Sequence, residues 1–215
     1  MKRISSLLPL LLLVTALACK ASSITETFTP SGGFLYQATF SEPGGEWGEK
    51  AIEAGAAGYT NGAYRILVNL PNSHVWSRPG LSFENVRVEA AVFPAAGPAD
   101  SRMGVICRLA DDRNFYFFAI SADGFYGIGK MKDSQVTILT GNGVMLPTET
   151  IHTGAVPNQV RGDCAGKTLT LYVNNQRVDS AEDSDFSVGD VGLFAGTFAQ
   201  PGADVYFDNF FVIKP

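Results

Sequence analysis

Residues 114–121 read NFYFFAIS and residues 125–131 read FYGIGKM, with the sequence Ala-Asp-Gly between them at 122–124. Both runs are rich in the aromatic and β-branched residues that strands favour. An Asp-Gly pair between two apolar runs is a strong signal for a β-hairpin. This stretch therefore predicts two antiparallel strands whose side chains alternate between two faces.

The same pattern of short alternating runs, separated by turn residues, extends along the rest of the chain. We expect further strands at 63–69, 85–93, 102–109, 135–140, 159–164, 167–173, 191–196 and 205–213, and a hairpin through the two asparagines at 174–175. No long run with a 3.6-residue period appears. About a dozen short strands at this spacing are typical of a β-sandwich, so we predict an all-β fold of two antiparallel sheets.

The composition suits one domain of this kind. The chain has 215 residues, and 46% of them are hydrophobic, which is enough for a sizeable core. Its 16 basic and 21 acidic residues give a formal charge of −5. Nucleic acids and anionic membrane surfaces are bound through basic patches, so this balance argues against both as partners.

The N-terminal residues predict export. Lys2 and Arg3 form a positive region, residues 7–17 are mostly apolar but too few to span a bilayer, and residues 16–18 (ALA) fit a cleavage site. We therefore predict a signal peptide at 1–18, whose loss leaves 14 basic and 21 acidic residues and a formal charge of −7. Residues 19–33 are rich in Ser, Thr and Gly and read as a flexible tether, which leaves 34–215 as the folded domain.

Cys19 directly follows the predicted cleavage point. It resembles the lipidated cysteine of bacterial lipoproteins, although Leu17 and Ala16 invert the usual order of leucine and small residue. In the other reading, an ordinary signal peptidase cuts after Ala18 and the protein is freely secreted. We favour the lipid anchor, which would be the only contact with a membrane, and a location in the cell envelope or at the cell surface.

Two further cysteines, Cys107 and Cys164, lie in predicted strands. An exported chain folds in an oxidising compartment, where an even pair of cysteines reads as a disulfide. Alternation places Cys107 on the same side as Val105 and Leu109, and Cys164 on the same side as Val160. We predict a disulfide between the two; two buried free thiols are the alternative.

Eight segments occur in a characteristic order: FSEP at 40–43 with Trp47, GVICR at 104–108, NFYFF at 114–118, SADG at 121–124, DCAG at 163–166, LTLYVN at 169–174, DVGL at 190–193 and FDNF at 207–210. Together they resemble a concanavalin A-like sandwich domain of bacterial exported lipoproteins, of the laminin-G/glucanase type that includes 3-keto-glycoside hydrolase-like domains. The resemblance covers nearly everything after residue 35. It implies a jelly roll of two antiparallel sheets, one of them concave, among relatives that bind or cleave sugars.

The resemblance does not extend to the catalytic residues of glucanases. Those enzymes carry closely spaced carboxylates on one strand, in a Glu-x-Asp-x-x-Glu or Glu-x-Asp-x-Glu pattern, as retaining hydrolysis requires. Here Glu89 has no acidic partner two residues on, and the acidic residues 182–185 fall in a predicted polar turn. We therefore expect a carbohydrate-binding or adhesion-type module rather than an enzyme. A glycoside-processing enzyme with other catalytic residues, or a purely structural envelope lipoprotein, are the alternatives.

A glycan surface needs exposed aromatic rings, because the apolar faces of sugars stack on them. Trp76, in a predicted turn beside Arg78 and Pro79, is the best single candidate. Phe115 and Phe117 share one side of the aromatic strand and are candidates to line the concave sheet. Three arginines at outward strand positions are further candidates to bind hydroxyl or carboxylate groups: Arg65, Arg87 and Arg108.

The resemblance also implies a structural calcium ion near the joined terminal strands. Asp208 matches the aspartate that this fold carries in its last strand, and Glu42 is a candidate to face it. The alternative for Asp208 is a hydrogen bond to nearby backbone. The only two histidines, His74 and His152, are far apart in the sequence and have no cysteine nearby, so the spacing does not support a zinc site.

Overall fold

The computed structural model describes residues 33–215, in which every regular element is a β-strand. The predicted signal peptide, Cys19 and all but the last residue of the predicted tether lie outside the described residues. No helix in residues 33–215 is both long and apolar enough to cross a membrane.

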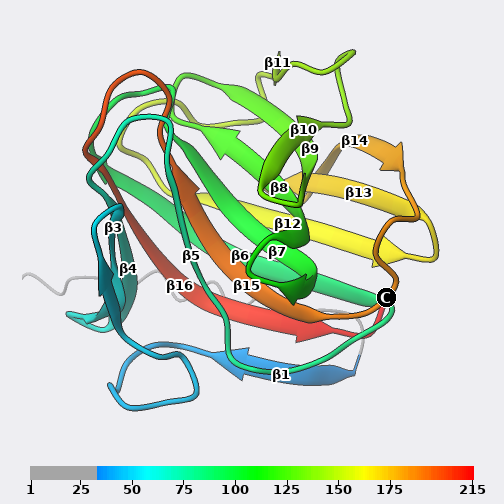
Figure 1. The fold of residues 1–215 in the computed structure, drawn as a ribbon, viewed down its shortest axis with the longest axis horizontal. Coiled ribbons are helices and arrows are strands. Elements are labelled where there is room, and N and C mark those ends of the chain that lie inside the picture. Colours follow the sequence, from blue (N-terminus) through cyan, green and yellow to red (C-terminus); the bar gives the residue numbers. More distant parts are fainter. Residues whose placement is uncertain (1–32) are drawn as a thin grey trace, which may run out of the picture. The chain divides into compact units, whose positions relative to one another are not determined.

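Nine strands form one antiparallel sheet, here called sheet A, in the order β14-β13-β12-β6-β16-β4-β3-β2, with β1 also paired to β16. In Figure 1 the blue β1 and the red β16 accordingly lie side by side, so the first and last strands of the domain meet. The strands of sheet A are β1 (Phe34–Ala38), β2 (Lys50–Ile52), β3 (Gly55–Thr60), β4 (Ala63–Val68), β6 (Val86–Ala96), β12 (Asn158–Ala165), β13 (Thr168–Val173), β14 (Gln176–Glu182) and β16 (Ala203–Ile213).

Seven strands form the second antiparallel sheet, sheet B, in the order β10-β9-β8-β7-β15-β5, with β11 also paired to β9. The sequence predicted most of these strands, but not the short β5 at one edge or the two-residue β11 at the other. The strands of sheet B are β5 (His74–Ser77), β7 (Arg102–Asp111), β8 (Asn114–Ser121), β9 (Phe125–Lys132), β10 (Gln135–Ile138), β11 (Leu146–Pro147) and β15 (Asp190–Gly196).

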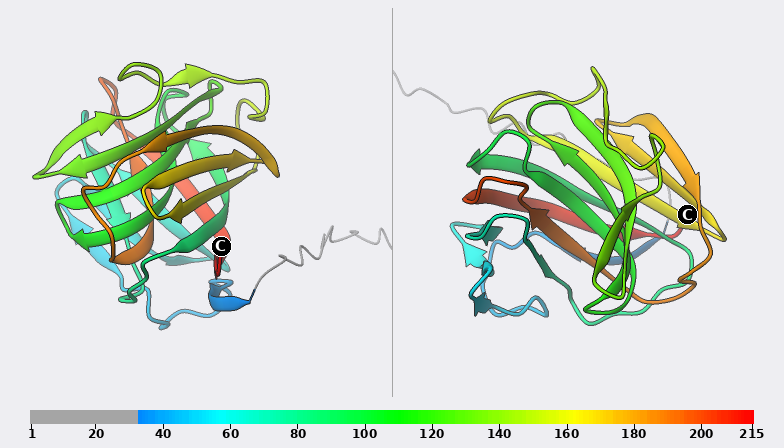
Figure 2. Two further views of the ribbon diagram at one scale, coloured as in Figure 1. Left: turned by 90° about the vertical axis from the view of Figure 1, so that its right-hand side faces the viewer. Right: turned by 45° about the horizontal axis from the view of Figure 1, so that its top comes forward.

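The two sheets pack against each other around an apolar core (Figure 2). Alternate residues of both sheets supply it, among them Val88 and Leu171 from sheet A and Val105, Phe118 and Ile128 from sheet B. Alternation of this kind is what a strand with one face on a core produces. The predicted two-sheet sandwich is confirmed.

The hairpin predicted for residues 114–131 forms as expected. The predicted strand at 114–121 coincides with β8, and it pairs with β9 so that Phe118 stands opposite Ile128. Gly124 adopts a left-handed φ of 95° in the connecting turn, which glycine tolerates without strain. The Ser121 hydroxyl accepts a hydrogen bond from the Phe125 N–H at 3.2 Å and thereby closes the turn.

A disulfide joins the two sheets. Cys107 on β7 of sheet B is bonded to Cys164 on β12 of sheet A, with a Cα–Cα distance of 6.8 Å. Both residues are fully buried in the core between the sheets. The predicted pairing is confirmed, and it links the layers across the core rather than neighbouring strands of one sheet.

One detail of β7 differs from the prediction. Arg108 adopts a φ of 50°. The pairing register of β7 shifts here against both of its neighbours, β8 and β15, so the strand contains a bulge at this point. The bulge reverses the alternation, and Leu109 therefore joins a cluster on the opposite face from Cys107. The expectation that Cys107 and Leu109 share a face is wrong for this reason.

We expect removal of the disulfide, by Cys107→Ala with Cys164→Ala, to lower the free energy of unfolding by about 4 kcal/mol. The bond closes a loop with a sequence separation of 57 residues, and opening it returns chain entropy to the unfolded state. Urea denaturation measures the change, with reduced wild-type protein as a control that keeps both sulfur atoms. Two free thiols in the unreduced, denatured protein would contradict the assignment.

Candidate ligand-binding surface

Trp76 lies on β5, the edge strand of sheet B, and not in the turn that the sequence predicted. Residues 74–77 become a strand because they pair with β15, where Trp76 stands opposite Phe194. The Trp76 side chain is half-buried, and its ring centroid lies 5.5 Å from that of Phe115 on β8. Long-range pairing thus places Trp76 against the aromatic strand.

A second apolar cluster covers the outer face of sheet B, the face that points away from sheet A. Phe115 and Phe117 line this face, as the alternation predicted, but they are only 2% and 3% exposed and lie beneath the surface that Trp76 borders. Room for them comes from neighbouring glycines: a Cβ at Gly129 would overlap the ring of Phe117. The buried members of the cluster are Ile106, Leu109, Phe115, Phe117, Ala119, Met131 and Phe194.

A pocket of about 240 Å³ opens beside Trp76. The Lys50 ammonium lies 5.1 Å from the centre of the Trp76 ring, and Arg78 pairs with Asp112 at 3.5 Å. Burial lowers the pKa of Lys50, the positive charge of Arg78 acts in the same direction, and Asp112 opposes both. The pocket therefore combines a flat aromatic ring with charged donors and acceptors at its edge. Its lining is Gly48, Glu49, Lys50, Trp76, Ser77, Arg78 and Asp112.

The three arginines that the sequence singled out do not join Trp76. Arg65 and Arg87 lie on the outer face of sheet A, where each donates two hydrogen bonds to one carboxylate, that of Asp204 and that of Asp163. Arg108 is not outward at all: it is 2% exposed and donates to backbone carbonyls at 2.8 and 3.1 Å. The bulge at Arg108 turns this side chain to the edge of the sandwich, where it holds two loops.

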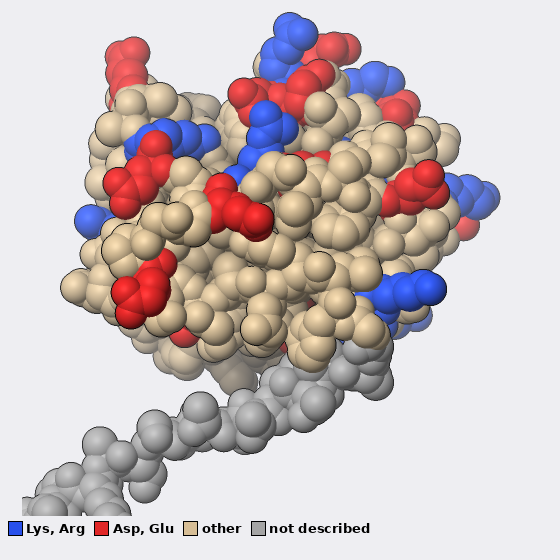
Figure 3. Space-filling view, turned by 90° about the horizontal axis from the view of Figure 1, so that it is seen from below, with Lys and Arg blue, Asp and Glu red and all other residues tan. Residues whose placement is uncertain are grey.

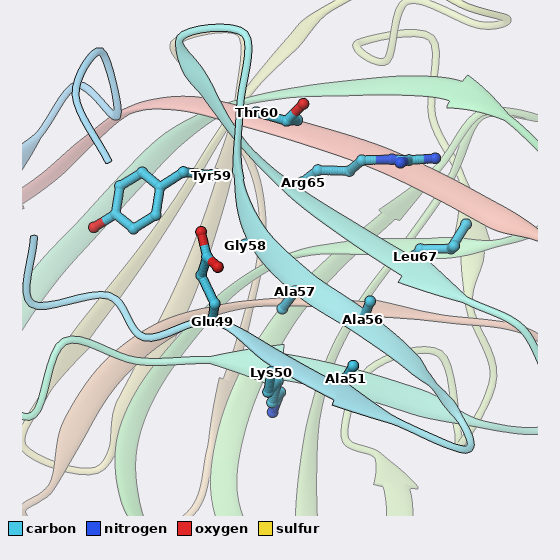
Figure 4. Close-up of a pocket in the computed structure, with 10 residues that line it drawn as sticks. All are labelled: Glu49, Lys50, Ala51, Ala56, Ala57, Gly58, Tyr59, Thr60, Arg65 and Leu67. Carbon is cyan, nitrogen blue, oxygen red and sulfur yellow. The ribbon is translucent and has the colours of Figure 1, made fainter. Parts of the chain in front are cut away.

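A second hollow, of about 440 Å³, lies on the outer face of sheet A over β2, β3 and β4 (Figure 4). Its floor is formed by small residues such as Ala56 and Gly58. In Figure 4 the Glu49 carboxylate points toward Gly58, while Lys50 points away, toward the Trp76 side of the strand. The aromatic residue of this hollow, Tyr59, packs its ring against Tyr64 of the core. This hollow therefore also presents one aromatic ring, that of a tyrosine rather than of a tryptophan.

The acidic residues that the sequence analysis considered for catalysis, Glu89 and those at 182–185, are held by other side chains. Asp183 and Asp185, from the acidic segment predicted as a turn, both bind the Lys130 ammonium at 2.5 Å. Glu89 is 1% exposed and accepts a hydrogen bond from Gln159 at 2.8 Å. Burial raises the pKa of Glu89, although Gln159 opposes this. Its second carboxylate oxygen, Oε2, is buried and has no hydrogen-bond partner in the described chain.

The predicted metal residues are not brought into a cluster. Among residues 33–215, no group of three or more His, Cys, Asp and Glu side chains is arranged to hold a metal ion. Asp208 accepts a hydrogen bond from the Asn209 backbone N–H at 2.7 Å, and burial raises its pKa. Glu42 lies exposed in the loop after β1. A calcium site at Asp208 and Glu42 thus stays a prediction, to which the structure adds no further ligand.

Two polar residues on the outer face of sheet B escaped the sequence analysis as a pair. His74 on β5 and Arg102 on β7 stand on either side of Gly196 of β15, which pairs with both. Burial, with the charge of Arg102 in support, lowers the pKa of His74 to about 4. Burial likewise lowers the pKa of Arg102 to about 10. Only the strand order reveals this proximity, because the two residues are distant in sequence.

A comparison with protein-family models and with curated sequences finds no match. Solved structures do share the fold. The carbohydrate-binding module CBM66 from Bacillus subtilis superposes with a TM-score of 0.55, at 17% identity over 79% of this chain and 96% of that chain. A protein of unknown function with a galectin-like fold, also from Bacillus subtilis, gives 0.59, at 12% identity over 85% and 96%.

The laminarinase catalytic domain from Thermotoga maritima also gives a TM-score of 0.59, at 10% identity over 86% of this chain and 98% of that chain. Binding modules and hydrolases thus share this architecture, and at these identities the likeness concerns the fold alone. The chain has the concanavalin A-like jelly-roll sandwich fold that its sequence resembles.

We expect the protein to lose stability in mild acid because of His74. Its folded-state pKa of about 4 lies below the ordinary 6.5, so its contribution is complete above pH 6.5 and is lost as the pH falls toward 4. The free energy of unfolding of the wild type should fall by up to about 3 kcal/mol across this range relative to His74→Gln. Urea titrations at several pH values measure this, and parallel curves for the two proteins would refute it.

Proposed function

We propose that the domain is a non-catalytic glycan-binding module and that its outer sheet B surface at Trp76 contacts the sugar. The observation that carries the proposal is the half-buried Trp76 ring, backed by Phe115 and edged by Lys50, Arg78 and Asp112. Sugars bind through apolar ring faces and hydroxyl groups together. This pocket offers an aromatic face with charged hydrogen-bonding groups around it.

The fold comparison supports a sugar as the ligand, since the similar structures include a carbohydrate-binding module and a laminarinase. The charge distribution is compatible with a glycan partner as well. Acidic and basic side chains are interspersed on the face seen from below in Figure 3, with no continuous basic patch on it. A nucleic acid is disfavoured on the same ground as in the sequence.

Binding rather than hydrolysis is favoured by the side chains of sheet B. Retaining glycosidases place two carboxyl groups about 5 Å apart across the scissile bond. On the neighbouring strands β8 and β9, the outward positions carry Phe, Ala, Ser, Gly and Met instead of Asp or Glu. The proposed surface thus lacks an acid–nucleophile pair on these strands.

We expect Trp76→Ala to weaken binding to any recognised glycan by about 1–3 kcal/mol, because it removes the stacking surface. A glycan array identifies the ligand, with and without calcium, and titration calorimetry measures the affinity of the folded protein. Trp76→Phe, which keeps an aromatic ring, should retain most of the affinity. Tyr206→Ala, which removes a half-buried aromatic from the outer face of sheet A, is the matched control and should bind as the wild type does.

Three results would count against the proposal. Unchanged affinity in Trp76→Ala together with lower stability would make Trp76 a packing residue only. Release of reducing sugar from the bound glycan would favour the enzyme alternative. No binding to any glycan and no hydrolysis would favour a structural envelope protein.

We further propose that the protein is exported and tethered to the cell envelope through an acylated Cys19. The motifs at residues 1–19 support this, and so does the disulfide, which requires an oxidising compartment. Intact-mass analysis of the protein extracted from membranes should show an N-terminal Cys19 carrying several acyl chains, enough for stable anchoring. A soluble, secreted form with an unmodified Cys19 would disprove the anchor.

A further inference from the structure

The arginines on the outer faces of the two sheets differ in their ion pairs. On the outer face of sheet A, Arg65 is paired with Asp204, and both Arg87 and Arg161 are paired with Asp163, at distances of 2.7–3.0 Å. On the outer face of sheet B, Arg102 has no ion pair and no side-chain hydrogen bond to any other part of the described chain. Arg108 also lacks an ion pair, but it donates to backbone carbonyls. Arg102 has no such acceptor, and Asp100 acts on it through its charge without forming an ion pair.

Arg102 is also deeply buried. It is 7% exposed, and its Nε lies out of reach of solvent with no hydrogen-bond partner. An unpaired buried charge is costly for a fold, as is a buried donor without an acceptor. The ring of Phe198, 4.2 Å from the guanidinium carbon, supplies some compensation, but a ring face does not satisfy an N–H in the plane of the guanidinium.

The surroundings of Arg102 bring a second polar group to the same place. His74 and Arg102 flank Gly196 in the pairing of β5, β15 and β7. A Cβ at Gly196 would overlap the imidazole ring, so the absence of a side chain there lets His74 lie over the strand toward Arg102. The two groups converge on one spot of the outer face, which the 37% exposed Phe198 borders.

We propose that His74 and Arg102 bind the oxyanion of an acidic sugar, a carboxylate or a sulfate, so that the glycan recognised by this surface is anionic. The proposal rests on the glycan-binding function above and assigns its ligand class. A guanidinium fork is well suited to hold two oxygens of such a group. The bound anion would balance the Arg102 charge, which forms no ion pair within the described chain.

The position of this pair fits a sugar that also reaches Trp76. His74 and Trp76 are two residues apart on β5 and share its outer face, which separates their Cα atoms by about 7 Å. An oligosaccharide of two or three units spans that distance. Because one arginine at the site meets one anion, this mode of binding does not need a basic patch, and it is compatible with the overall charge of −5.

The test uses sugars in matched pairs that differ only in charge: glucuronate beside glucose, galacturonate beside galactose, and 6-sulfated galactose beside galactose, each at the end of the same oligosaccharide. We expect the wild type to prefer at least one acidic member by about tenfold or more. The carboxylate and sulfate pairs distinguish the two anions. Inorganic sulfate alone should compete with the acidic sugar, since it fills the same site.

Arg102→Met removes the charge and keeps most of the side-chain length. We expect it to abolish the preference for the acidic sugar and to keep or raise the melting temperature, because the buried unpaired charge is gone. A purely structural arginine would instead lower the melting temperature on replacement. Arg65→Met, which removes a paired arginine from sheet A, is the control and should leave the preference intact.

The outcomes separate this inference from the proposed function. If neutral sugars bind and Trp76→Ala weakens them, but acidic partners bind no better than neutral ones, the glycan-binding function stands and the anion site is wrong. An acidic preference that survives Arg102→Met also overturns the site. If inorganic sulfate binds the wild type and not Arg102→Met while no sugar binds, the anion site stands and the glycan-binding function fails.

Discussion

Sheet B carries apolar side chains on both of its faces, and much of the molecule follows from how the second face is accommodated. An antiparallel sheet in a sandwich usually buries one face and offers a polar one to water. Here the outer face holds a buried cluster that includes Phe115, Phe117 and Phe194. The rings fit because glycines such as Gly129 stand on neighbouring strands and leave room for them. The sheet is thereby packed on both sides.

The outer faces of the two sheets consequently carry different kinds of side chain. The outer face of sheet A carries arginines and aspartates in bidentate pairs, with the buried Glu89 beside them. The outer face of sheet B is apolar in its middle. Trp76 and His74 lie on its edge strand β5, and Arg102 lies at the start of β7, on the other side of β15. Polar groups at the margin of an apolar surface are costly unless they are satisfied. At this part of the outer face, the proposed anion would supply the partner that the Arg102 charge lacks.

The fold also holds the candidate surface rigidly. Phe115 backs the Trp76 ring, and the disulfide between Cys107 and Cys164 ties β7 of sheet B to β12 of sheet A. A binding residue whose neighbours are already packed loses little conformational entropy when a ligand arrives. The aromatic strand that identifies the fold in the sequence therefore also steadies the surface, even though its own rings are buried.

Local pattern alone determined a good part of this protein. Alternation and turn residues predict the aromatic hairpin, most strands and the sandwich, and an even pair of cysteines behind a predicted signal peptide predicts the disulfide. Alternation cannot predict a bulge, so the turn of Arg108 to the edge of the sandwich was missed. Nor can it show which strands become neighbours. Only the tertiary structure decided that β5 and β7 flank β15, because strand order depends on contacts between residues distant in sequence. That order brings His74 to Arg102 across Gly196, and no local signal contains it.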